Sequence, residues 1–414
     1  MIKKVVLSLS VLCSIAATAQ ESTGSPYSVY GIGDQKFKGS NEHRAMGGLS
    51  VIGDSIHLNL SNPASYADLG VTTFSIGASH TNYKLQALQE SEKTKRTSLD
   101  YLAIGFPVGK HAGVSFGLMP FTNVGYSIQN SGTFEELSQS MQHTGKGGLN
   151  KVYLGTGIKL FKGFKLGVDA QYYFGKIENR TLLATQGVQY ISRSVNENNN
   201  SGVAFNLGAM YQFKVNKYDI HSSFSYSPEA NLNVSTERNI STVILGTAGN
   251  EISVETRPVT IADSKFKLPA AYSFGTSFGK LKNWMIGAQV TLADAKQADV
   301  LISNLQYENS SRYVLGGYYI PKYNSFNSYF SRVTYRAGLR YEKTGMILNN
   351  ESIDDKAITA GVGLPLGAIF SNLNIGLEYG KRGTKAAGLI QENYFSINLG
   401  FSFNDRWFQK VKYN

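Results

Sequence analysis

Apolar and polar residues alternate along this chain with a period of two, over lengths that suit a membrane-crossing strand. The pattern is clearest in residues 164–176, 203–214, 284–292 and 395–403. In the first of these, the apolar face is Phe164, Leu166, Val168, Ala170, Tyr172 and Phe174. Successive side chains of a strand point to opposite faces, and about 9–11 residues of tilted strand cross a bilayer. No apolar run after the first twenty residues is long enough for a membrane helix, so strands must do any crossing.

The alternation divides the chain into about fourteen strands. They run roughly at 71–81, 97–108, 112–128, 150–161, 164–182, 202–214, 217–237, 268–280, 283–298, 311–320, 331–343, 356–367, 371–382 and 392–404. Tight connections alternate with longer polar ones, as in outer-membrane barrels with short periplasmic turns and long extracellular loops. A barrel in lipid must close, because an open edge finds no water there. We therefore predict an all-β chain whose residues 71–404 form an antiparallel transmembrane β-barrel of about 14 strands, rather than two soluble sandwiches.

Two regions leave the strand boundaries open. Residues 238–267 are long and polar, and several divisions into strands are possible. Residues 321–330, PKYNSFNSYF, lie where a tight turn is expected, so the count there is uncertain by one hairpin.

The first nineteen residues have the features of a secretory signal peptide. Lys3 and Lys4 precede an apolar run at 5–15, and small residues at 17–19 form a cleavage site. Acylation at Cys13 is the alternative, but Leu12 stands where a small residue is required. The signal and the strands predict the outer membrane of a Gram-negative bacterium. Residues 405–414 are expected to be a periplasmic tail that docks a partner or is simply solvated.

Arg44–Leu69 has neither strand alternation nor a helical stripe. It contains Gly47-Gly48 and the compact triplet Asn62-Pro63-Ala64. We predict that residues 20–70 are a periplasmic lead-in followed by a hatch that plugs the lumen. The triplet is interpreted as a turn that holds the hatch in shape, with direct ligand contact as the alternative.

Charge argues for a membrane partner rather than nucleic acid. The chain has 40 Lys and Arg against 29 Asp and Glu, a net charge of +11, but these charges form no basic arm. Anionic lipid headgroups are the expected partner of exposed cations. Charges on the polar strand faces are interpreted as salt bridges between wall and plug, or as pore lining: Lys159, Lys165, Asp169, Lys176, Arg336, Arg340 and Glu378.

Catalytic and metal-binding patterns are missing from the sequence. The six histidines show no metal-ligand spacing, and the one cysteine is removed with the signal. Asp54, Ser55 and His57 are too close along the chain to form a hydrolytic triad, which assembles across a fold. We expect no enzyme activity, no metal and no cofactor.

Two motifs resemble the FadL/TodX-type family of outer-membrane transporters for long-chain fatty acids and other hydrophobic compounds. One is MGGLSV followed by SNPASYADL, at 46–51 and 61–69, and the other is Leu268-Pro269, with Gly275 a few residues later. The resemblance implies a fourteen-stranded barrel with an N-terminal hatch. It also implies that hydrophobic molecules enter from outside and leave sideways through a gap in the wall.

Pro120 lies inside the third predicted strand, between Gly117 and Gly125. Proline cannot donate a ladder hydrogen bond, and a closed barrel has no edge where that loss is harmless. The hypothesis is a kink that opens the wall beside the hatch. The alternative is a bulge where the strand leaves the membrane.

We predict passive uptake of hydrophobic, fatty-acid-like molecules through a hatch-side apolar pocket and a lateral gap. The alternative is a non-transporting barrel subunit of a larger outer-membrane secretion or barrel-assembly machine. The expected partners are outer-membrane lipids, a hydrophobic ligand and other outer-membrane or periplasmic proteins.

Overall fold

Fourteen strands form a closed antiparallel barrel in the computed structural model, which describes residues 24–134, 136–246, 250–294, 305–367 and 371–407. The ring closes where β20 pairs with β2, from Thr72 opposite Asp405 to Gln86 opposite Gln391. The predicted fold class and strand number are confirmed. In order around the wall the strands are β2 (Thr72–Gln86), β3 (Ser91–Val108), β4 (Ala112–Pro120), β6 (Leu137–Phe161), β7 (Phe164–Thr185), β8 (Ile191–Val215), β9 (Tyr218–Ser227), β13 (Ala271–Lys280), β14 (Trp284–Ala293), β16 (Ser310–Tyr319), β17 (Thr334–Leu348), β18 (Glu351–Leu366), β19 (Ser371–Arg382) and β20 (Gln391–Asp405).

The two faces of the wall differ as the alternation predicts. Along β20 the exposed residues include Phe395, Leu399 and Phe403, whereas Ser396 and Asn398 are buried inside. The outer face is thus an apolar band, as lipid requires. Among the described residues, no helix is both long and apolar enough to span a membrane.

The two ends of the barrel differ. At one end the strands are joined by short turns such as Gly109–His111, and this short-turn end also receives the end of β20. At the other, long-loop end, the connections that we expected to be loops are largely strands. The first halves of β5 (Thr122–Phe134) and β10 (Ala230–Leu245) fall within predicted strands, and their second halves lie in expected loops. The other strands in these connections are β11 (Glu251–Thr260), β12 (Ser264–Leu268) and β15 (Leu305–Tyr307), together with the extended ends of β6, β7 and β8.

Prolines mark three places where wall strands break and change partners. Pro120 ends β4, Pro228 separates β9 from β10, and Pro269 separates β12 from β13. Below its break β4 pairs with β3 and β6, but β5 beyond it pairs with β6 and the short β1 (Asp34–Gln35). In the part of the chain that the structure describes, no ladder joins β5 to β3.

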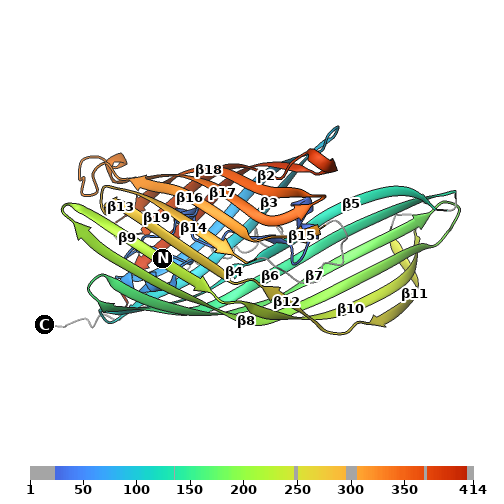
Figure 1. Cartoon of the computed structure of the whole chain (residues 1–414), viewed down its shortest axis with the longest axis horizontal. Helices are drawn as coiled ribbons and strands as arrows, with labels where there is room; N and C mark the ends of the chain where they lie inside the picture. Colours follow the sequence, from blue (N-terminus) through green and yellow to red (C-terminus); the bar gives the residue numbers. More distant parts are fainter. Residues whose placement is uncertain (1–23, 135, 247–249, 295–304, 368–370, 408–414) are drawn as a thin grey trace.

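The barrel is consequently split into two lobes at the long-loop end. The first lobe comprises β5, β10, β11, β12 and the far ends of β6, β7 and β8, which extend together to the right in Figure 1. The second lobe comprises β15, β17–β20, β2 and β3. At the other end, residues 320–333 connect β16 directly to β17 through the 3₁₀-helix η3 (Phe330–Arg332), so this long connection hides no extra hairpin.

The hatch packs against the inner face of the wall, where glycines make room for it. It contains the short helix α2 (Asn41–Arg44) and the 3₁₀-helix η2 (Pro63–Asp68). A Cβ atom on Gly157 would lie 2.6 Å from the Pro63 oxygen, and one on Gly167 would overlap the backbone of Pro63 and Ala64. A Cβ atom on Gly338 would likewise overlap the backbone of Met46.

Replacing Gly167 with Val is expected to displace η2 and lower the free energy of unfolding by about 1–3 kcal/mol, the usual effect of overpacking. Gly132→Val is the matched control, because no atom lies within 4 Å of a Cβ built there. Urea unfolding in detergent micelles measures the free energy of unfolding of both variants. Equal stability of the two variants would contradict close packing of hatch and wall.

Candidate functional site

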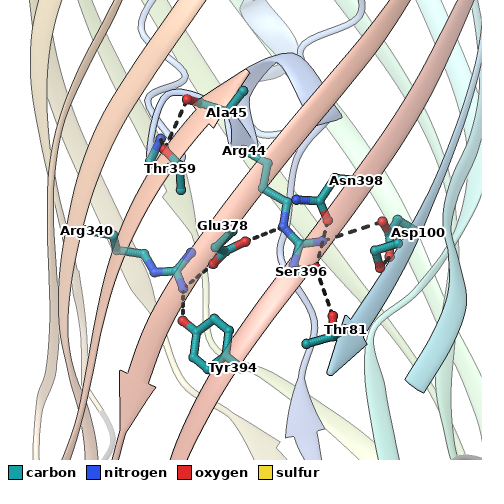
Figure 2. A network of polar contacts seen from close by, with 12 residues as sticks. Arg44, Ala45, Thr81, Asp100, Arg340, Thr359, Glu378, Tyr394, Ser396 and Asn398 are labelled. Carbon is teal, nitrogen blue, oxygen red and sulfur yellow. Dashed lines mark hydrogen bonds and ion pairs between the residues drawn. The ribbon is translucent and has the colours of Figure 1, made fainter. Parts of the chain in front are cut away.

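A buried ion-pair network, the brace, ties the hatch to four wall strands, β3, β17, β18 and β19. Arg44 of α2 donates from Nε to Glu378 Oε2 at 2.6 Å, and its Nη1 lies 3.6 Å from Asp100. Arg340 donates to the other oxygen of Glu378 at 2.8 Å and to Asp355 at 3.0 Å. Figure 2 shows Glu378 between the two arginines, and its side chain is only 2% exposed. The hatch therefore supplies one cation and the wall supplies its partners.

Backbone contacts beside the brace fix the hatch further. Thr359 of β18 donates to the Ala45 carbonyl oxygen at 3.0 Å and accepts from the Gly47 amide at 2.8 Å (Figure 2). On the opposite side of the lumen, Lys165 pairs with Asp68 of η2, and Lys159 lies 3.6 Å from the same carboxylate. Four of the charges singled out in the sequence therefore take part in the contact between wall and hatch. Lys159, Lys165 and Glu378 bind hatch residues directly, and Arg340 binds Glu378.

Asn62, Pro63 and Ala64 anchor the hatch to the wall. Asn62 caps η2 by accepting from the Ala64 amide at 3.1 Å, and it donates to the Phe224 carbonyl of β9 at 3.1 Å. All three residues are buried, and none lines the lumen cavity described below. This geometry gives the triplet a holding role.

The second motif contacts both the hatch and the lumen. Leu268 is buried against the first lobe, and Pro269 occupies the break between β12 and β13. A Cβ atom on Gly275 would overlap the Val51 side chain, so this glycine lets the hatch approach β13.

Gly117, Pro120 and Gly125 surround the predicted kink. The β3–β4 ladder stops at Leu102 opposite Leu118, and β5 begins at Thr122. A Cβ atom on Gly117 would lie 2.6 Å from the Leu102 oxygen. The wall is therefore interrupted at Pro120, and a seam separates β5 from residues 91–101 of β3.

Residues 24–38, which we call the strap, occupy this seam. On the β5 side, the Gly24 amide donates to the Gly125 oxygen at 3.0 Å, and Asp34 and Gln35 pair with Asn123 and Thr122. On the β3 side, Lys36 donates to Ser98 at 2.8 Å. The strap joins two edges that share no ladder.

The strap also holds the two lobes through charge and apolar contact. Asp34 accepts from Arg382 of β19 and lies 3.6 Å from Arg96 of β3. Two apolar residues of the strap contact different lobes. Ile32 packs into the core of the first lobe, and Tyr27 packs with Leu305, Leu348 and Ile353 of the second lobe.

The position of the strap differs from our expectation for residues 20–43. We expected a lead-in on the periplasmic side, at the short-turn end. The described part, from Gly24, instead contacts the long-loop end: Ser25 donates to Glu392 at the start of β20, and Tyr27 donates to the Ile390 oxygen at 2.5 Å. The sequence carried little signal for this, because the partners lie more than 360 positions away.

A cavity of about 400 Å³ lies between strap, hatch and wall. Apolar side chains such as Phe121, Phe266 and Leu268 contribute to its lining. Charged side chains also line it, with cations somewhat in excess. The charged residues that line it are Asp34, Lys36, Lys38, Arg44, Arg96, Asp100, Lys151, Arg312, Arg340, Glu342, Asp355, Glu378, Arg382 and Glu392.

One strap lysine responds to this environment. Burial, with Arg96 nearby, lowers the pKa of Lys36 to about 7, because desolvation disfavours the charged amine. Lys38 lines the same cavity and stays exposed.

Within the described residues, no cluster of three or more His, Cys, Asp or Glu side chains is arranged to hold a metal ion. Asp54 and His57 form an ion pair at 2.6 Å within the hatch. The ion pairs inside the lumen hold the hatch, and a molecule that entered the cavity would contact charged side chains.

Solved structures with the same fold are outer-membrane channels. The chain aligns with the CymD monoaromatic hydrocarbon channel (TM-score 0.58, 11% identity, covering 90% of this chain and 98% of that one). It aligns similarly with the Pseudomonas putida toluene transporter TodX (0.56, 14%, 90% and 99%) and a Pseudomonas aeruginosa FadL homologue (0.56, 11%, 89% and 98%). No curated protein matches by sequence. The molecule thus has the FadL-type plugged-barrel fold, as the motifs indicated.

A family model described as BamG matches residues 1–414. The chain therefore belongs to the BamG family.

Replacing Glu378 with Gln is expected to loosen the hatch, because two buried arginines lose their shared carboxylate. Removing one partner of a buried pair costs about 3–5 kcal/mol. Urea unfolding should show that loss, and ion conductance in planar bilayers should rise. Tyr379→Phe, on the exposed face of the same strand, should change neither. In Arg44→Gln/Glu378→Gln the two losses should be less than additive.

Proposed function

We propose that this chain is a plugged, non-conducting barrel subunit of a larger outer-membrane assembly of the barrel-assembly type. In this proposal the short-turn end faces the periplasm and the split lobes face the exterior, the usual orientation of outer-membrane barrels. The protein binds partners and carries out no covalent chemistry.

The observation that carries the proposal is the set of charged side chains that line the lumen cavity. A pocket for hydrophobic molecules is mostly apolar and contains only a few polar groups. The cavity between hatch and wall is instead lined by fourteen charged residues, those of the brace among them. An apolar molecule there would separate buried charges from their partners or from water at a high cost.

The first lobe supports partner binding. Ile240, Leu245, Ile252 and Val254 of the β10–β11 hairpin are each at least 47% exposed. The hairpin lies in the first lobe, beyond the apolar band of the wall, so in this proposal lipid does not cover these side chains. Apolar side chains gathered on a paired, extended hairpin are typical of a protein contact surface. The name of the family, BamG, agrees with this function.

Gentle purification from native membranes tests the proposal. Large stoichiometric outer-membrane or periplasmic partners should accompany the tagged protein. Ile252→Asp/Val254→Asp should lower their recovery severalfold, whereas Val188→Asp, an equally exposed apolar position in another connection, should not. A lone barrel with a bound fatty acid or hydrocarbon would overturn the proposal.

A second candidate function is uptake through the seam. The ladder interruption after Pro120 favours it, and so does the fold shared with hydrocarbon channels. In that case the strap would have to move, since it contacts both sides of the seam.

A disulfide that fixes the strap separates the two functions. Gln35 and Thr122 lie opposite each other, at a spacing that a disulfide tolerates, and the chain has no cysteine beyond Cys13. If the second function holds, Gln35→Cys/Thr122→Cys stops hydrocarbon uptake into liposomes until reduced, and Pro120→Val lowers it. Ser140→Cys/Ala184→Cys, within the first lobe, is the control. Absent uptake in every sample supports the non-conducting subunit.

A further inference from the structure

We propose that two neighbouring turns at the short-turn end, residues 280–283 and 320–333, form a binding platform for anionic phospholipid headgroups of the adjacent leaflet. The proposal is independent of whether the lumen conducts.

Hydrogen bonds join the two turns into one surface. Asn283 donates from its side chain to the Ile320 oxygen at 3.3 Å, and the Tyr318 hydroxyl donates to the Leu281 oxygen at 2.6 Å. The longer turn is braced internally, since the Lys322 amide donates to the Ser331 oxygen at 2.8 Å. Residues 320–333 were the one short-turn connection that the barrel pattern did not explain.

Cations on this platform rest on aromatic rings. Lys280 lies 5.6 Å from the ring centre of Tyr218, Lys282 lies 5.1 Å from Tyr323, and Arg332 lies 5.6 Å from Tyr329. The three lysines Lys280, Lys282 and Lys322 are exposed. The rings hold Lys280, Lys282 and Arg332 in place and leave the other side of each cation open to an anion.

No acidic residue lies in either turn or in the neighbouring parts of β14, β16 and β17 up to Arg336. The nearest carboxylate on the adjoining strand is Asp219 of β9. It is engaged by the Leu281 amide at 3.4 Å and by Lys214 at 3.7 Å. The platform therefore presents excess positive charge.

Aromatic residues place the platform at the membrane surface. Tyr218, Phe278 and Trp284 form a contiguous ring cluster, with centroids 4.7–6.1 Å apart, on the outer face of β9, β13 and β14. The band continues through Tyr319 opposite Trp284 and Tyr335 opposite Tyr319. Such rings occupy the headgroup level of a membrane barrel.

The longer turn folds back toward this band. The Tyr335 hydroxyl on the outer face donates to the Phe330 oxygen at 3.4 Å, and Tyr329 donates to the Pro365 oxygen at 3.1 Å. In Figure 1 this turn is the orange loop at the left-hand end of the barrel. Phe326 is 99% exposed and Phe330 is 72% exposed. Aromatic side chains beside a lipid-facing band, next to cations, fit the surface of an anionic leaflet.

Fluorescence quenching by brominated lipid tests this lipid preference. The chain has two tryptophans, so Trp407→Phe leaves Trp284, within the platform's aromatic cluster, as the reporter. The protein is reconstituted in phosphatidylcholine vesicles that contain chain-brominated phosphatidylglycerol or chain-brominated phosphatidylcholine. We expect phosphatidylglycerol to be preferred about fivefold at low salt, because each nearby cation attracts anionic lipid, and less at high salt.

Two triple variants with the same charge change locate the effect. Lys280→Gln/Lys282→Gln/Lys322→Gln should abolish the preference. Lys110→Gln/Lys162→Gln/Lys217→Gln, in three other short turns, should leave it intact. No preference in the parent protein, equal loss in both triples, or an unaffected platform triple would each overturn the proposal.

A second reporter distinguishes lipid from protein as the occupant. Phe326→Trp, in a chain whose own tryptophans are replaced by Phe, should be quenched by the brominated phosphatidylglycerol. If the fluorescence of this Phe326→Trp variant is not quenched in vesicles, or is shielded by a protein that co-purifies from native membranes, the lipid assignment is wrong.

Discussion

The contact between hatch and wall depends on charges that are largely buried. Glu378 is almost fully enclosed and accepts from one arginine of the hatch and one of the wall. A carboxylate in such a place is tolerable only while both cations remain, because an uncompensated buried ion costs several kcal/mol. The hatch is thus held by a requirement for charge neutrality as well as by shape. Its wall glycines provide the shape, since they allow backbone to lie against backbone.

Prolines explain how a closed barrel can also be divided. Each of Pro120, Pro228 and Pro269 lacks an amide hydrogen, and at each one the strand breaks and the ladder changes partner. The barrel is continuous below these breaks and consists of two lobes above them. The strap replaces the missing ladder between β5 and β3 with a short antiparallel pair on one side and polar side-chain contacts on the other.

Much of the wall could be predicted because lipid enforces alternation on every strand that crosses it. Residues 164–176 and 395–403 are examples, and the polar faces of the predicted strands also pointed to Lys165 and Glu378 as charges that join wall and hatch. Much of the first lobe was not predicted, because its strands lack a buried face: every residue of β11 but the first is exposed, so its sequence carries no period of two. The position of the strap was not predicted for another reason. Its partners, such as Arg382 and Glu392, are set by closure of the barrel, and no local pattern records them.

The contacts of the strap also bear on the order of folding, because they join the two ends of the chain. Ser25 contacts Glu392, 367 positions later, and Asp34 contacts Arg382, 348 positions later. Contacts of such high sequence separation are costly to form early, because a very long loop must be closed to make them. We therefore expect the segment that leaves the ribosome early to be secured late, after β20 has joined β2.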